Sequence, residues 1–196
     1  MKDKFENKFI KRGTNVIHFE YLGSLISEDD ILELEQKLHV HNLELSRFDT
    51  DGVIYASMDN FQLVTYFVIS QPIINELLKN IGVNIVWETI KYIVLKIWKK
   101  VKTKQVANLT SKQKTQKEIS FGIKVKLDKN TSFNFKLDGD IDDSTIENSL
   151  DKILDFINKQ KLNKEFKHAD MVCIDKKTKN WYKIDTEEEL SRRNKK

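Results

Sequence analysis

A strict alternation of apolar and polar residues after residue 118 constrains the fold more than any other part of the chain. The apolar positions of its first run, separated by Ser, Gly and Lys, are Ile119, Phe121, Ile123, Val125 and Leu127. A second run, at Phe133, Phe135 and Leu137, follows the turn-forming residues Asp128, Lys129 and Asn130. A period of two with one apolar side predicts strands that bury one face and leave the other solvated. The segment therefore predicts an antiparallel hairpin.

The hairpin is followed by a predicted helix and a second hairpin. Asp142 to Ser144 is typical of a helix start, and the apolar positions that follow, at helical spacing, are Ile146, Leu150, Ile153, Leu154 and Ile157. Ala169–Ile174 and Trp181–Ile184 flank a lysine-rich turn and predict two further strands. A short helix is predicted after Thr186. Residues 119–196 thus form a β-β-α-β-β unit.

The first 58 residues predict a β-α-β-β unit. Asn15–Leu22 is rich in β-branched and aromatic residues and predicts a strand. Ser27, followed by three acids, is a typical helix start, and that helix is predicted to stop near His41 and Asn42. Leu43–Phe48 and Val53–Ser57 flank a turn signal and predict a pair of strands.

An apolar and basic helical segment is predicted at residues 59–104. Asp59 and Gln62 resemble a capping box, Pro72 interrupts the pattern, and further helices are predicted over Ile73–Asn80 and Val83–Lys104. Residues 105–118 are polar, without periodicity, and predict a mobile linker. The fold class expected is α+β, with a central helical hairpin between the two units.

Composition restricts the class of protein. With 196 residues, 39% of them apolar and eleven Phe, the chain can bury a sizeable core. One cysteine excludes an internal disulfide framework and suits a reducing compartment. The N-terminus alternates charges and lacks an apolar run of signal-peptide length. The longest charge-free stretch, Asn60–Asn75, contains Gln62, Ser70 and Pro72, which disfavours a transmembrane helix. We expect a cytoplasmic protein, with peripheral membrane attachment as the alternative.

Positive charge is concentrated in one stretch. Between Lys91 and Lys117 there are nine lysines and no acid. Because the whole chain carries +4, removing these nine charges leaves −5 for the rest. Blocks of like charge often serve as interaction segments, and their partners are anionic.

The predicted helix over 83–104 has more apolar residues than one buried face requires. Two tryptophans, Trp87 and Trp98, are eleven residues apart and fall on the same apolar face. Ile85, Tyr92 and Leu95 lie on the opposite, lysine-bearing side. This excess predicts contact with a neighbouring helix, another subunit, a partner protein or a membrane surface. The candidate interaction residues are Ile85, Trp87, Lys91, Tyr92, Leu95, Lys96, Trp98, Lys99, Lys100, Lys102 and Lys104.

Several interpretations of this segment stay open. The plainest is that helices 61–80 and 83–104 form an antiparallel pair that covers the sheets. An interfacial helix with aromatics toward the acyl chains and lysines toward anionic head groups is the second. Nucleic-acid binding is less favoured, because the lysines do not interleave with exposed aromatics and the stretch has no arginine.

No motif for catalysis, metal binding or cofactor binding is evident. His39 and His41 lack a third ligand in sequence, and Cys173 lies in a predicted strand, where core packing is expected. The acids from Asp138 to Asp143 fail the EF-hand pattern and suit a helix cap. No glycine-rich phosphate loop, zinc spacing or nucleophile elbow appears. An enzyme built from scattered acids with His18 or His168 is the least favoured alternative.

The element order of residues 15–158 resembles that of the effector-associated constant components of bacterial conflict systems. The shared features are a β-α-β start, an apolar helical bridge and a strand hairpin followed by a helix; no motif residues are shared. The resemblance implies a part that couples an effector to a partner or a membrane. The expected function is that of a non-enzymatic adaptor or accessory subunit, whose partner is another protein or a second copy. An anionic membrane surface or nucleic acid is the alternative.

Overall fold

The computed structural model describes residues 11–51, 63–79, 84–109, 114–128, 131–163 and 170–184. Within these ranges the chain forms both helices and strands. In order they are β1 (Val16–Tyr21), α1 (Glu28–His39), β2 (Glu44–Asp49), β3 (Thr65–Ile69), α2 (Gln71–Lys79), α3 (Ile85–Val101), β4 (Gln105–Leu109), β5 (Lys114–Glu118), β6 (Phe121–Lys126), β7 (Ser132–Leu137), α4 (Asp143–Asp151), α5 (Ile153–Asn163), β8 (Asp170–Ile174) and β9 (Trp181–Ile184).

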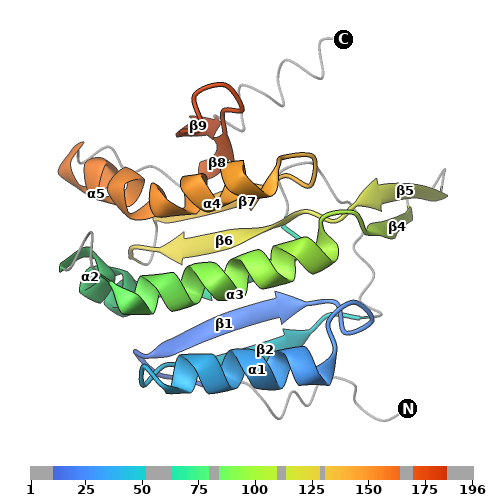
Figure 1. Cartoon of the computed structure of the whole chain (residues 1–196), viewed down its shortest axis with the longest axis horizontal. Coiled ribbons are helices and arrows are strands. Elements are labelled where there is room, and N and C mark those ends of the chain that lie inside the picture. The colour runs from blue at the N-terminus through green and yellow to red at the C-terminus, as the bar shows by residue number, and fades with distance from the viewer. Residues whose placement is uncertain are drawn as a thin grey trace.

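A seven-stranded mixed sheet in the order β2-β1-β3-β6-β7-β8-β9 organises the molecule. Helices α1, α3, α4 and α5 lie on one face of this sheet, so the molecule has two layers (Figure 1). The pairs β1/β2, β3/β6 and β7/β8 are parallel, and the remaining neighbours are antiparallel. The α+β class expected from the sequence is confirmed.

Each parallel pair is joined by a helical crossover, and the crossovers do not share one hand. Strands β1 and β7 run in the same direction, as the chain of pairings between them requires. The β1–β2 and β7–β8 crossovers lie on the same face of the sheet. The first advances toward the β2 edge and the second toward the β9 edge. The two crossovers therefore have opposite hands. Because nearly all such connections are right-handed, one of the two is an exception.

Helix boundaries follow from local capping. Ser27 caps α1 in a capping box with Asp30, Asn84 accepts from the backbone N–H groups of Val86 and Trp87, and Asp142 caps α4. Each cap satisfies backbone donors that the first turn leaves unpaired. The predicted starts at Ser27 and near Asp142 are confirmed. The acids before α4 therefore include a capping residue.

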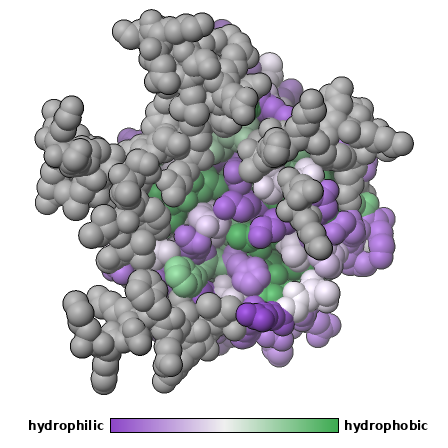
Figure 2. All heavy atoms as spheres, turned by 180° about the vertical axis from the view of Figure 1, so that it is seen from behind, coloured by the Kyte–Doolittle hydropathy of each residue, from purple (hydrophilic) through white to green (hydrophobic). Residues whose placement is uncertain are grey.

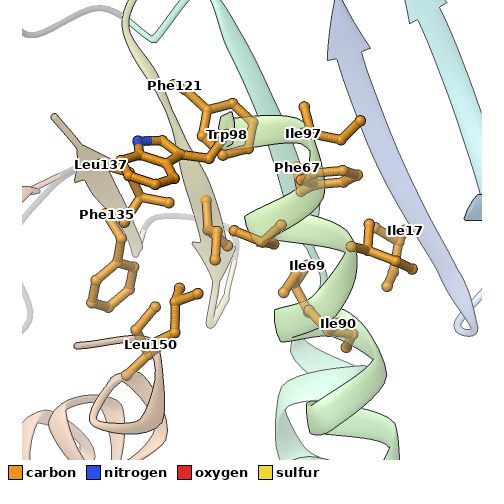
Figure 3. Close-up of a cluster of buried hydrophobic side chains, with 14 of the residues drawn as sticks. Ile17, Phe67, Ile69, Ile90, Ile97, Trp98, Phe121, Phe135, Leu137 and Leu150 are labelled. Carbon is orange, nitrogen blue, oxygen red and sulfur yellow. The ribbon is translucent and has the colours of Figure 1, made fainter. Parts of the chain in front are cut away.

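The core lies between the sheet and its helices. Trp98 of α3 is fully buried and packs among Phe121, Phe135 and Leu137 of β6 and β7 (Figure 3). Phe19 and Phe67 stack with ring centroids 4.2 Å apart. Burying side chains of this size supplies a large part of the driving force for folding. The core runs without a break from α1 to α4.

One helix predicted from the apolar stretch is wrong. The structure forms a strand, β3, over Thr65–Ile69, where a helix beginning at Asp59 and interrupted at Pro72 was predicted. Strand β3 lies between β1 and β6 in the sheet interior, so both of its edges are paired. A short, continuous apolar run does not distinguish a buried strand from a buried helix. Here the β-branched and aromatic residues were the better signal.

The predicted linker also carries regular structure. Residues 105–118 contain β4 and β5, which pair antiparallel in a separate two-stranded sheet. Neither strand shows the regular apolar alternation by which strands are recognised. Strand β5 (Lys-Thr-Gln-Lys-Glu) is entirely polar, and β4 (Gln-Val-Ala-Asn-Leu) mixes polar and apolar residues without a period of two. The two predicted units, 1–58 and 119–196, contribute strands to the same seven-stranded sheet. Val53–Ser57 and the helix after Thr186 lie outside the described residues.

Candidate interaction surface

The two tryptophans of the predicted surface are not on a surface. Trp87 and Trp98 are 4% and 0% exposed, respectively, and both belong to the core. Neither indole N–H has an acceptor, which fits an apolar packing role. Leu95 is half-buried and packs against the same core. These three residues are corrected from interaction residues to packing residues.

The lysines of α3 are neutralised by acids from distant parts of the chain. Lys91 pairs with Glu88 at 2.8 Å and also with Asp151, and Lys96 pairs with Glu33. Asp143 lies 3.2 Å from Lys99 and 2.7 Å from Lys102, and Lys100 lies 2.6 Å from Asp30. Of the described lysines in the candidate set, only Lys104 has no acidic partner. In the described helical part of the block, acids that are distant in sequence therefore compensate most of the positive charge.

These ion pairs shift the proton equilibria of the acids. Burial of Asp30 opposes its ionisation, but hydrogen bonds from Lys100 and Ser27 outweigh it and lower its pKa to about 2. A hydrogen bond from Lys96 lowers the pKa of Glu33. Burial acts against the charge of Lys91, yet the carboxylates of Asp151 and Glu88 raise its pKa. The pairs thus connect α3 to α1 and α4.

A smaller set of apolar side chains stays exposed. Ile85 is 71% and Tyr92 is 47% exposed on α3, and Val40, at the end of α1, is 77% exposed. All three border one open depression between α1 and α3. The depression is lined by Lys37, Val40, His41, Ile85, Glu88, Thr89 and Tyr92. We call these seven residues the α1–α3 depression.

Contacts between the two helices fix the walls of the α1–α3 depression. The Lys37 ammonium lies 4.3 Å from the centre of the Tyr92 ring, and the Tyr92 hydroxyl donates to Glu33 at 3.1 Å. On the other side, Nε2 of His41 and Oγ1 of Thr89 are 2.9 Å apart. A partner would therefore meet a preformed surface with little side-chain ordering left to do.

The sequence identified two of the three exposed apolar residues of this surface. Ile85 and Tyr92 were singled out as apolar residues on the polar side of the helix. Val40 was not, although an apolar residue between His39 and His41 at a helix end is a signal that could have found it. Its place beside Ile85 depends on the packing of α1 against α3, which sequence distance hides.

Other candidate chemistry is weak in the described part of the chain. Burial raises the pKa of the Cys173 thiol to about 11, so the thiolate is strongly disfavoured. Among the described residues no group of three His, Cys, Asp or Glu side chains is placed to hold a metal ion. None of the helices in those residues combines the length and apolarity that crossing a bilayer requires.

The comparisons with known proteins identify no relative. No protein-family model, no curated protein and no solved structure matches this chain.

Proposed function

We propose that this chain is a binding protein that docks a partner protein at the α1–α3 depression, as an accessory or adaptor subunit. The observation that carries the proposal is the exposure of Val40, Ile85 and Tyr92 around one preformed depression. Exposed apolar side chains that cluster around a concave surface are typical of docking sites, whereas scattered ones are ordinary.

The charges at the rim favour a protein over a membrane or nucleic acid. The depression carries both signs, with Lys37 on α1 and Glu88 on α3. The lysines of α3 that would have attracted phosphate groups are paired with carboxylates. A surface with apolar anchors and mixed charge matches a protein partner of complementary shape. The resemblance to conflict-system components assumed a helix where the structure has strand β3. The proposal therefore depends on the α1–α3 depression and not on that resemblance.

Site-specific photo-crosslinking tests the proposal in cells that express the full chain. A photoreactive phenylalanine analogue replaces Ile85 or Val40 in turn, and the matched control replaces Leu32. Leu32 is also exposed, at 45%, and lies on α1 but does not line the depression. We expect one shared adduct from positions 40 and 85 that is absent from position 32. The same adducts from all three positions, or none from 40 and 85, would contradict the proposal.

Introducing a charge gives a second readout. Ile85→Glu places a carboxylate at the exposed anchor and should abolish the shared adduct formed from position 40. Because Ile85 is 71% exposed, the variant should keep its fold, which circular dichroism checks. Light scattering after size exclusion determines whether the partner is a second copy of the chain.

A further inference from the structure

The sheet face opposite the helices carries charges that the fold does not neutralise. Phe19, Phe67, Ile123 and Phe135 point into the core, so their strand neighbours point to the other face. Figure 2 shows this face, where hydrophilic side chains gather over the middle with hydrophobic ones between them. One row across β1, β3, β6 and β7 consists of His18, Val68, Lys124 and Asn134.

Two lysines on β6 lie on this face without a carboxylate partner. Lys124 and Lys126 are two residues apart and therefore share the face. Among the described residues, no acid lies within ion-pair distance of either ammonium group. The charge of Glu20 favours the ionised form of Lys124 without forming an ion pair with it, and the Glu20 carboxylate accepts a 2.5 Å hydrogen bond from the Tyr66 hydroxyl. Lys124 is left with the Tyr66 ring, 4.2 Å from its ammonium group.

The surroundings of this cluster disfavour uncompensated positive charge. Burial lowers the pKa of Lys124. Burial also lowers the pKa of His18, and the charge of Lys126 lowers it further. A partly buried cation without a counter-ion is costly to the fold. A bound anion would remove that cost.

The neighbouring row limits the size of the anion. That row contains Glu20 on β1, two strands from β6, and Lys136 on β7, which is already paired with Asp138 at 2.7 Å. Between Tyr66 and Lys136 in that row is Gly122, where a Cβ would lie 2.2 Å from the Phe135 carbonyl oxygen and within 3 Å of Leu63. The cluster is thus confined to three side chains, His18 and the two lysines of β6. It suits one anionic group better than a polymer of phosphates.

We propose that His18, Lys124 and Lys126 bind a single phosphate group of a small molecule on the open face of the sheet. Strands β1 and β6 are separated by β3, so the backbones of His18 and Lys124 are about 10 Å apart. The half-buried Val68 lies between them as the floor. Two ammonium groups match a dianion and make charge-assisted hydrogen bonds to it. The Asn134 amide, whose oxygen is buried without a donor, borders the cluster in the same row.

An NMR titration of the full chain tests this proposal independently of the α1–α3 depression. Inorganic phosphate and adenosine monophosphate are titrated in turn at constant ionic strength, and the backbone amide shifts are followed. We expect saturable shifts at β1 and β6 with either ligand. In Lys124→Gln/Lys126→Gln the dissociation constant should rise at least ten-fold. The control Lys99→Gln removes one exposed, ion-paired helix lysine and should leave binding unchanged.

Each result decides the proposal. Equal affinity for phosphate and the nucleotide identifies the phosphate group as the determinant, and tighter nucleotide binding that still requires both lysines adds a nucleoside contact. Absent or unsaturable shifts would overturn the proposal, as would equal weakening in the control. A thymidylate dodecamer that binds ten-fold tighter than the mononucleotide would replace it with a nucleic-acid surface. Circular dichroism verifies that the double variant is folded.

Discussion

The outer side of α3 and the open face of the sheet differ in how lysine density in the sequence relates to ion pairing in the fold. The α3 stretch is the most basic in the chain, yet its lysines meet acids from α1 and α4. On β6, Lys124 and Lys126 alternate with apolar residues, and in the described part of the chain they have no acidic partner. Charge density along a sequence therefore says little about which cations are available to a ligand.

The same contrast holds for the aromatic residues. Trp87 and Trp98, on the basic helix, are buried, whereas Tyr92 remains half-exposed beside Val40 of another helix. Availability depends on which side of α3 faces the sheet and which faces α1. Four predictions test this contrast, in order of decreasing effect.

The largest effect is expected from Trp98→Ala. The side chain is fully buried among Phe121, Phe135 and Leu137, so its removal should lower the free energy of unfolding by about 3 to 5 kcal/mol. Leu32→Ala, at an exposed position, should change it by less than about 0.5 kcal/mol. Urea unfolding measures both. A loss below about 1 kcal/mol for Trp98→Ala would show that this side chain is not buried in the core.

Acid should break the ion pairs of α1 with α3. Because the folded-state pKa of Asp30 is below its ordinary value, its contribution is complete above pH 4 and is lost as the pH falls toward 2. The contribution is at most about 2 kcal/mol. Asp30→Asn should lack this part of the acid sensitivity. Unfolding curves from pH 7 to pH 2 compare the two proteins, and parallel profiles would show that Asp30 is not held in its ionised form.

The same substitution on the two surfaces should have opposite signs. Lys100→Met leaves the buried Asp30 carboxylate with one partner fewer and should destabilise the fold by about 1 to 2 kcal/mol. Lys124→Met removes a half-buried charge without a counter-ion and should stabilise the fold by up to about 1 kcal/mol. Thermal unfolding in phosphate-free buffer measures both. Destabilisation of the same size by the two variants would remove the contrast between the surfaces.

The smallest effect on stability is expected from Ile85→Glu. The residue is 71% exposed, so the free energy of unfolding should change by no more than about 0.5 kcal/mol. Denaturant unfolding measures the change, with Ile90→Glu as the contrasting variant on the buried side of α3, where the protein should fail to fold. A large loss for Ile85→Glu would show that its side chain contributes to the fold and not to docking.

Sequence patterns predicted elements wherever one face was apolar and the other polar. The hairpin of β6 and β7, helix α1 with its Ser27 cap, and the buried face of α3 all follow from periodicity and caps. The prediction failed at Thr65–Ile69, which is apolar at every position but one and carries no period. It also failed at β4 and β5, whose sequences show no regular alternation of apolar and polar residues.

The α1–α3 depression was predictable only on one side. Ile85 and Tyr92 were found because they break the polar side of a helix, which is a pattern within one element. Val40 and Lys37 come from another element, about 50 residues away in sequence. The acids that neutralise α3 are equally distant. A sequence pattern within one helix does not indicate which distant residues the fold places beside it.

The sequence by itself determined the main apolar face of α3, where α1 and α4 begin, and the alternation of β6 and β7. It did so because backbone geometry links these features to neighbours within a few residues. Only the tertiary structure decided which lysines keep an available charge and which apolar residues stay exposed. Coulombic pairing and burial depend on distances in space, and the chain sets those distances only once it has folded.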